Sequence, residues 1–150
     1  MPDSLELIHQ DLAEEVSWGI PSLYNTWAEH RQIDPFIIIW PSRTINFKGQ
    51  LVNDSIPIQL PDERAERSRA ISAAVKETTA WALMLCEQRA EAVVVIFESP
   101  MGTKSWHLPL SKHGDVLTLG EPRERVNTDY IGVLWRPVTA GADREGSRYP

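Results

Sequence analysis

One segment sets the predicted architecture: residues 62–89, which read DERAERSRAISAAVKETTAWALMLCEQR. Its first half mixes acidic and basic side chains, and Glu63 stands four residues before Arg67, where opposite charges pair on a helix. At about 100° per residue, one broad face gathers the less polar side chains. These are Ile71, Ala74, Val75, Thr78, Trp81, Ala82, Leu85 and Cys86. The pattern predicts a single long helix over 62–89 with a buried face.

The turn at 81–86, WALMLC, is apolar nearly all round, because Leu83 and Met84 lie outside that face. A helix that is apolar on every side needs cover on every side. Either the N-terminal helices or a second chain can supply this cover. We therefore predict a homodimer whose interface contains Trp81, Leu83 and Met84.

Short apolar runs downstream predict an antiparallel meander. Residues 92–97 are rich in β-branched side chains and fit a central strand. Residues 105–110 alternate between apolar and other side chains, as a strand with one buried face does. Glycine-containing turns precede and follow that strand. Further strands are predicted over 116–119 and 130–135, with a polar loop over 120–129 between them.

Upstream, residues 36–40 read FIIIW between two prolines and predict a strand buried on both faces. Residues 44–47 predict a second strand. Residues 48–60 contain glycine, asparagine and proline, and predict a loop with at most a short edge strand.

Two helices are predicted before these strands. Asp3 and Glu6 resemble a capping box at a helix start near Ser4. Gly19 and Pro21 end this helix, and a second one is predicted over 22–31. The buried stripe of the first helix is Leu5, Ile8, Leu12 and Val16.

The order of elements predicts a two-layer α+β fold, in which the long helix and the N-terminal helices cover an antiparallel sheet of two strands followed by a meander of three to four. Over residues 36–136 this order resembles profilin-like folds such as the longin, roadblock, PAS and GAF groups, in topology only. We expect one globular domain over 1–136 and a flexible tail over 137–150.

Composition limits the class of protein. The chain has 150 residues, of which 42% are hydrophobic and 24% charged, as suits one globular domain. The single cysteine, Cys86, excludes an internal disulfide and a zinc site of several thiolates. The apolar runs are shorter than the about 20 residues that a transmembrane helix needs. The acidic N-terminus lacks the pattern of a secretory signal, so we expect a cytoplasmic protein.

The net charge of −6 is concentrated near the N-terminus. Residues 1–35 hold seven acidic residues against Arg31, whereas acids and bases balance over 36–150. Such a surface repels nucleic-acid phosphates and favours a basic partner. The alternative interpretation is that these carboxylates only form the solvated face of a helix. Tryptophan is enriched at protein interfaces. The predicted partner-binding residues are Glu6, Asp11, Glu14, Glu15, Trp18 and Trp27.

A metal site is the alternative chemistry. Its candidate ligands are His107, His113, Asp115 and Glu98, which lie around two predicted hairpins. Imidazole and carboxylate are suitable ligands for a divalent metal, but their spacing matches no metal-binding motif. The chain also contains no P-loop, dinucleotide-binding or G-x-S-x-G motif.

These observations favour a non-enzymatic protein-interaction domain of the adaptor, chaperone or inhibitor type, with no cofactor. It binds through the acidic N-terminal helices or an exposed sheet edge. A metal-dependent hydrolase and a small-ligand sensor, with its pocket between helix and sheet, remain open as alternatives.

Overall fold

The computed structural model describes residues 4–42 and 55–137. Their helices are α1 (Ser4–Gly19), α2 (Pro21–His30) and α3 (Arg64–Thr78). Their strands are β1 (Phe36–Pro41), β2 (Ile56–Gln59), β3 (Ala80–Gln88), β4 (Ala92–Ser99), β5 (Gly102–His113), β6 (Val116–Leu119) and β7 (Arg123–Val126). Within these ranges, no helix combines the length and apolar character that a membrane span requires.

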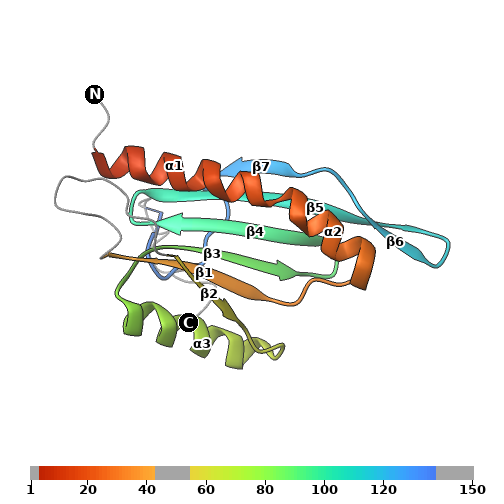
Figure 1. The fold of residues 1–150 in the computed structure, drawn as a ribbon, viewed down its shortest axis with the longest axis horizontal. Helices are drawn as coiled ribbons and strands as arrows, with labels where there is room; N and C mark the ends of the chain where they lie inside the picture. Colours follow the sequence, from red (N-terminus) through yellow and green to blue (C-terminus); the bar gives the residue numbers. More distant parts are fainter. Residues whose placement is uncertain (1–3, 43–54, 138–150) are drawn as a thin grey trace.

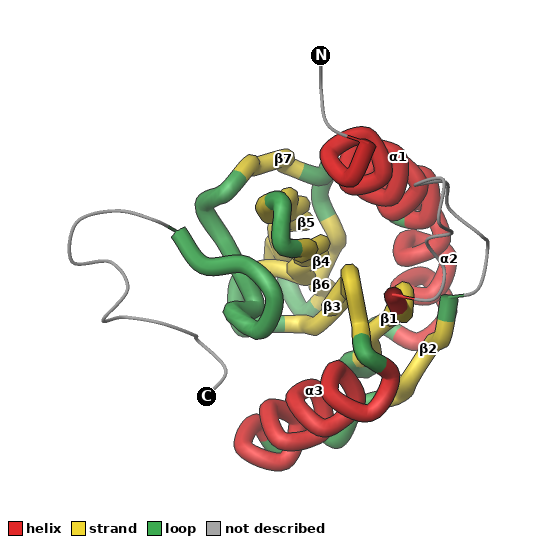
Figure 2. Tube along the Cα trace, turned by 90° about the vertical axis from the view of Figure 1, so that its left-hand side faces the viewer, coloured by secondary structure: helices red, strands yellow, loops and turns green. Residues whose placement is uncertain are grey.

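The strands form one curled antiparallel sheet (Figures 1 and 2), so the fold is α+β as predicted. The strand order is β2-β1-β3-β4-β5-β6, with β7 also paired to β5. The two short strands β6 and β7 follow one another along β5, opposite its second half and its first half respectively. The predicted meander from β4 to β6 is therefore confirmed, and β3 joins it as a central strand.

The sheet is covered on both faces. Strand residues such as Met84 and Val95 pack against α1 and α2. The alternate residues, such as Leu85 and Ile96, pack against α3 and the segment around Ile131. Figure 2 shows α1 and α2 on one side of the sheet and α3 on another. The helices thus lie in two separate layers with the sheet between them, in place of the single covering layer that we predicted.

The prediction of one long helix over 62–89 is wrong in its second half. Helix α3 begins as predicted, because the Glu63 carboxylate accepts hydrogen bonds from the backbone N–H groups of Ala65 and Glu66. It ends at Thr78, since Thr79 adopts a left-handed conformation with φ 52°. Strand β3 follows at once. Residues 81–86 of β3 are apolar on both sides because both faces of this central strand are covered by the same chain, which removes our reason for a second chain.

Three other expectations have different outcomes. Residues 130–135 form no strand, and β7 occupies part of the predicted loop over 120–129. The short edge strand expected within 48–60 is present as β2. The strand predicted over 44–47 and all but the first residue of the tail predicted over 137–150 lie outside the described residues.

The N-terminal helices follow the prediction closely. Ile8, Leu12 and Val16 of α1 are buried against the sheet as predicted, whereas Leu5 is only partly buried. The imidazole of His9 also faces the sheet, because its Nδ1 lies 2.6 Å from Ser99 Oγ and its ring contacts Phe97 at a centroid distance of 5.0 Å. These contacts fix the rotation of α1 and therefore decide which of its side chains face outward.

Candidate functional site

Helix α1 presents an outward stripe made of Leu7, Asp11, Glu14 and Trp18. The spacings of four, three and four residues place these side chains within about 60° of one another around the helix. Leu7 is 45% exposed and Trp18 is 70% exposed, while both carboxylates are exposed. The stripe therefore holds two carboxylates between two exposed apolar side chains, over about 16 Å of helix.

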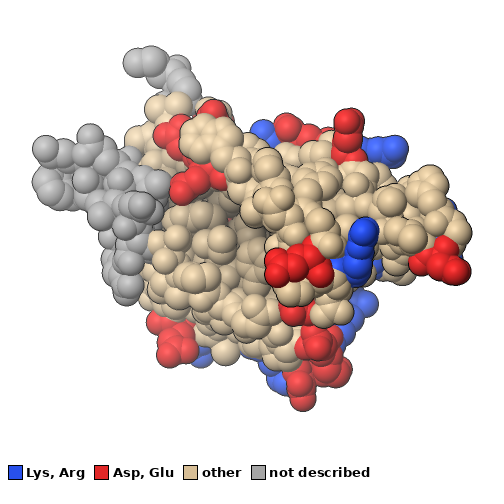
Figure 3. All heavy atoms as spheres, turned by 45° about the vertical axis from the view of Figure 1, so that its right-hand side comes forward, with Lys and Arg blue, Asp and Glu red and all other residues tan. Residues whose placement is uncertain are grey.

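The surroundings of the stripe are acidic. Glu6 and Glu15 are also exposed, and α1 contains no lysine or arginine. Figure 3 shows acidic groups along the upper part of the described surface, where α1 lies. Five of the six predicted partner-binding residues are thus exposed on α1. Sequence reasoning missed Leu7, although its helical spacing from Trp18 was a usable signal.

The sixth predicted residue, Trp27, lies elsewhere. It is only 3% exposed, and its indole N–H donates a hydrogen bond to the carbonyl oxygen of Leu117 at 3.2 Å. It therefore fastens α2 to β6 as part of the core and is not available at the surface.

The residues predicted for a dimer interface also serve the core. Leu83 and Met84 are 0% and 6% exposed on opposite faces of β3, and Trp81 is partly buried. Cover for all three comes from helices and strands of the same chain. Within residues 4–42 and 55–137, the strands at the edges of the sheet are β2 on one side and β6 and β7 on the other, and these edges are the other predicted binding surface.

The four candidate metal ligands do not meet. His113 and Asp115 are exposed in the turn between β5 and β6, where Gly114 takes the predicted positive φ. Across the described residues no group of three or more metal-ligating side chains is present. Glu98 is fully buried, and its two carboxylate oxygens accept four backbone hydrogen bonds. Because a carboxylate has about four lone-pair sites, these bonds leave none for a metal.

His107 has a different carboxylate partner, which the sequence did not suggest. Its Nε2–H donates to Asp129 Oδ2 at 2.9 Å, and Ser105 donates to the same oxygen at 2.7 Å. The serine contacts the aspartate and not the histidine, so the three residues do not form a nucleophile–base pair. The cluster instead ties the segment after β7 to the middle of β5.

The pKa of Asp129 reports this cluster. Burial alone raises the pKa of its carboxyl, but hydrogen bonds from Ser105 and His107 and the charges of His107 and Arg125 outweigh burial. The pKa therefore lies below the ordinary value of 3.8. Since the folded pKa is the lower one, the stability from Asp129 is complete above about pH 4 and is lost as the pH falls through the folded value.

We expect Ser105→Ala to raise the pKa of Asp129, because it removes one of the hydrogen bonds to the charged form. Carbon-13 NMR titration of the Asp129 carboxyl measures this shift. Ser111→Ala, an exposed position on the same strand, is the matched control and leaves the titration unchanged. Equal midpoints in the wild type and Ser105→Ala would show that the serine does not stabilise the carboxylate.

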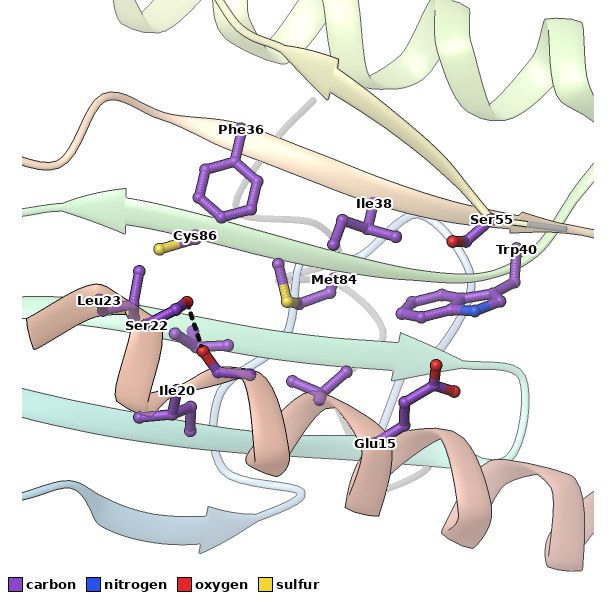
Figure 4. Close-up of a pocket in the computed structure, with 13 residues that line it drawn as sticks. Glu15, Ile20, Ser22, Leu23, Phe36, Ile38, Trp40, Ser55, Met84 and Cys86 are labelled. Carbon is purple, nitrogen blue, oxygen red and sulfur yellow. Dashed lines mark hydrogen bonds between the residues drawn. The ribbon is translucent and has the colours of Figure 1, made fainter. Parts of the chain in front are cut away.

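A pocket with a volume of about 300 Å³ lies between the N-terminal helices and the sheet (Figure 4). Its walls are mainly apolar side chains from α1, α2, β1, β3 and β4, including Phe36, Ile38 and Met84. The polar groups at its edge include Glu15 and Ser22. Cys86 also lines it, and burial, followed by the charge of Glu87, raises the pKa of this thiol to about 12. The thiol is therefore neutral and unsuited to nucleophilic attack.

Comparison with known protein families, with curated proteins and with solved structures finds no match.

Proposed function

We propose that the protein is a non-enzymatic interaction domain that binds a basic protein partner through α1. The observation that carries this proposal is the outward stripe, in which Leu7 and Trp18 stay exposed beside Asp11 and Glu14. Tryptophan is highly buried on average, and it is enriched among the residues that contribute most to protein interfaces, so the 70% exposure of Trp18 is the stronger part of this observation. A partner groove that accepts an amphipathic helix reads side chains at this spacing.

The charges of α1 favour a basic partner. A cationic groove is attracted to the carboxylates of the stripe, and the apolar ends then supply most of the binding energy. Adaptors, chaperones and inhibitors of basic proteins all fit this chemistry. The two carboxylates of the stripe are exposed on the outer face of α1, where they are suited to attract a cationic partner, so the proposal assigns the stripe recognition.

The first step of the test is to identify the protein that contacts the outer face of α1. A photoreactive residue placed at Gln10, which is exposed beside the stripe, crosslinks the partner in the native host, and one placed at Arg69 on α3 serves as the control. The affinity of the purified partner is then measured for the variants. We expect Trp18→Ala to weaken binding about 30-fold, since a tryptophan hot spot contributes about 2 kcal/mol or more.

A double variant, Asp11→Asn with Glu14→Gln, tests the charges. It should slow association and reduce its dependence on salt, because exposed charges act mainly on the encounter rate. Glu29→Gln on α2 is the matched control. Full affinity in Trp18→Ala, or wild-type affinity unchanged between low and high salt, would contradict the proposal.

The other predictions from the sequence have unequal support. The metal-dependent hydrolase has less support, because two of its candidate ligands already have other partners. The Glu98 carboxylate accepts four backbone N–H groups, and His107 is hydrogen-bonded to Asp129. The homodimer stays a prediction, without the reason first given for it. The profilin-like topology and its sensor role also stay predictions, and the pocket under α1 and α2 is the feature that bears on them.

A further inference from the structure

We propose that the pocket between α1, α2 and the sheet binds a small hydrophobic amine: a compact hydrocarbon body that carries one ammonium group. This site is separate from the outward stripe, and its ligand is not the partner proposed above. Two features of the pocket define the ligand, namely the apolar walls and the chemistry at one end.

The walls require a hydrocarbon body. Phe36 and Ile38 of β1 are only partly buried, although they face the pocket together with Met84 of β3. The volume of about 300 Å³ is at the lower end of the range for small-molecule sites, which are concave and mostly apolar with a few polar groups. Filling the pocket removes the exposed surface of these side chains from water, and this favours binding.

One end of the pocket selects the charge of the ligand. Figure 4 shows the Glu15 carboxylate pointing toward the end where Trp40 lies. Trp40 is only 4% exposed and forms part of the apolar wall, so the carboxylate is the group at this end that attracts an ammonium group, through opposite charge. Among the described residues Glu15 forms no ion pair, and no lysine or arginine lines the pocket.

The local charge disfavours anionic ligands. A fatty acid or another anionic amphiphile would place its carboxylate against Glu15, within the part of the chain that carries the net negative charge. An uncharged ligand of the same shape gains only the apolar contacts. We therefore expect octylamine to bind about three-fold more tightly than octan-1-ol, and octanoate to bind most weakly.

The methionines provide the measurement. The chain has three, and Met84 lines the pocket while Met101 lies exposed in the turn between β4 and β5. With carbon-13 methyl labelling, octylamine below its aggregation concentration should shift the Met84 signal saturably and leave that of Met101 in place. The variant Met84→Leu assigns the signal. The same titration with octan-1-ol and octanoate gives the order of affinities.

Two variants test the two features. Ser22→Trp places a large side chain at an exposed position on the pocket edge and should weaken octylamine at least ten-fold, whereas Ala28→Trp, exposed on the same helix and outside the pocket lining, should not. Glu15→Gln should weaken octylamine about three-fold and leave octan-1-ol unchanged, with Glu14→Gln as its control.

Different results would overturn the binding site and the ligand class. An unshifted Met84 signal in the wild type, or equal and unsaturable shifts of Met84 and Met101, would overturn the site without any need for the variants. Octanoate binding as tightly as octylamine would overturn the ligand class. Neither result affects the partner proposed for the stripe, because Trp18 lies outside the pocket lining.

Discussion

Replacing Glu98 with glutamine is expected to lower the free energy of unfolding by about 2–6 kcal/mol, although the two side chains have nearly the same shape. In the native protein Oε1 accepts the N–H groups of Ile131 and Gly132 at 2.7 and 2.8 Å. Oε2 accepts those of Val133 and Leu134 at 3.0 and 2.9 Å. A carboxamide keeps one acceptor oxygen and turns its NH₂ group toward the other two donors. Two backbone N–H groups then lose their partners, each at a cost of about 1–3 kcal/mol.

Denaturant unfolding and hydrogen exchange measure this effect. The amides of 131–134 should exchange much faster in Glu98→Gln, because the carboxylate is what protects them. Glu124→Gln is the matched control, since Glu124 is 53% exposed and its ion pair with Lys104 should contribute less than about 1 kcal/mol. If Glu98→Gln unfolds like the wild type, the four hydrogen bonds do not anchor the segment as described.

The segment anchored by Glu98 shows where sequence reasoning failed. Ile131, Val133 and Trp135 alternate, and this pattern favours a strand. Gly132 adopts a φ of 88°, which brings successive N–H groups toward one side and ends any strand pairing. A glycine inside a short apolar run was the available signal for a bend. Its partner, a carboxylate 33 residues away from Ile131, could not be found from spacing.

The second failure, at residues 80–88, has another physical cause. Apolar side chains on every side are typical of a buried helix and equally of a central strand, so period alone does not separate them. Thr78 and Thr79, two β-branched residues in succession, marked the boundary. By contrast, β1 and β4 were predicted correctly because prolines or turn residues bound them, and α1 because its apolar stripe is regular.

The candidate sites also divide into features that the local sequence predicts and features that depend on distant parts of the chain. The acidic, exposed character of α1 follows from local composition and helical spacing, so the stripe could be predicted except for Leu7. The burial of Trp27 depends on β6, which lies about 90 residues away in the chain. It could therefore not be predicted from the local sequence. The pocket is likewise formed by five elements, and its lining was expected only as a general space between helix and sheet.

The identity of β3 as a central strand leads to the other large effect. Leu85 is fully buried on β3, where it pairs with Ile37 on β1 and with Ile96 on β4. It also belongs to the cluster that packs against α3. Leu85→Ala should therefore lower the free energy of unfolding by about 2–5 kcal/mol, the lost transfer energy plus that of the cavity left behind. Leu7→Ala, the same substitution at a 45% exposed position, should change it by less than about 0.5 kcal/mol.

Hydrogen exchange can show whether Leu85→Ala destabilises the whole sheet or only the segment around residue 85. Because β3 pairs on both sides, its amides exchange only when the sheet opens as a whole, and we expect them to be among the most protected. Leu85→Ala should then reduce the protection of β1, β3 and β4 amides by one common amount that equals the loss measured in denaturant. A loss confined to 80–88, with β1 and β4 still protected as in the wild type, would mean that this segment opens independently and does not hold the two halves of the sheet together.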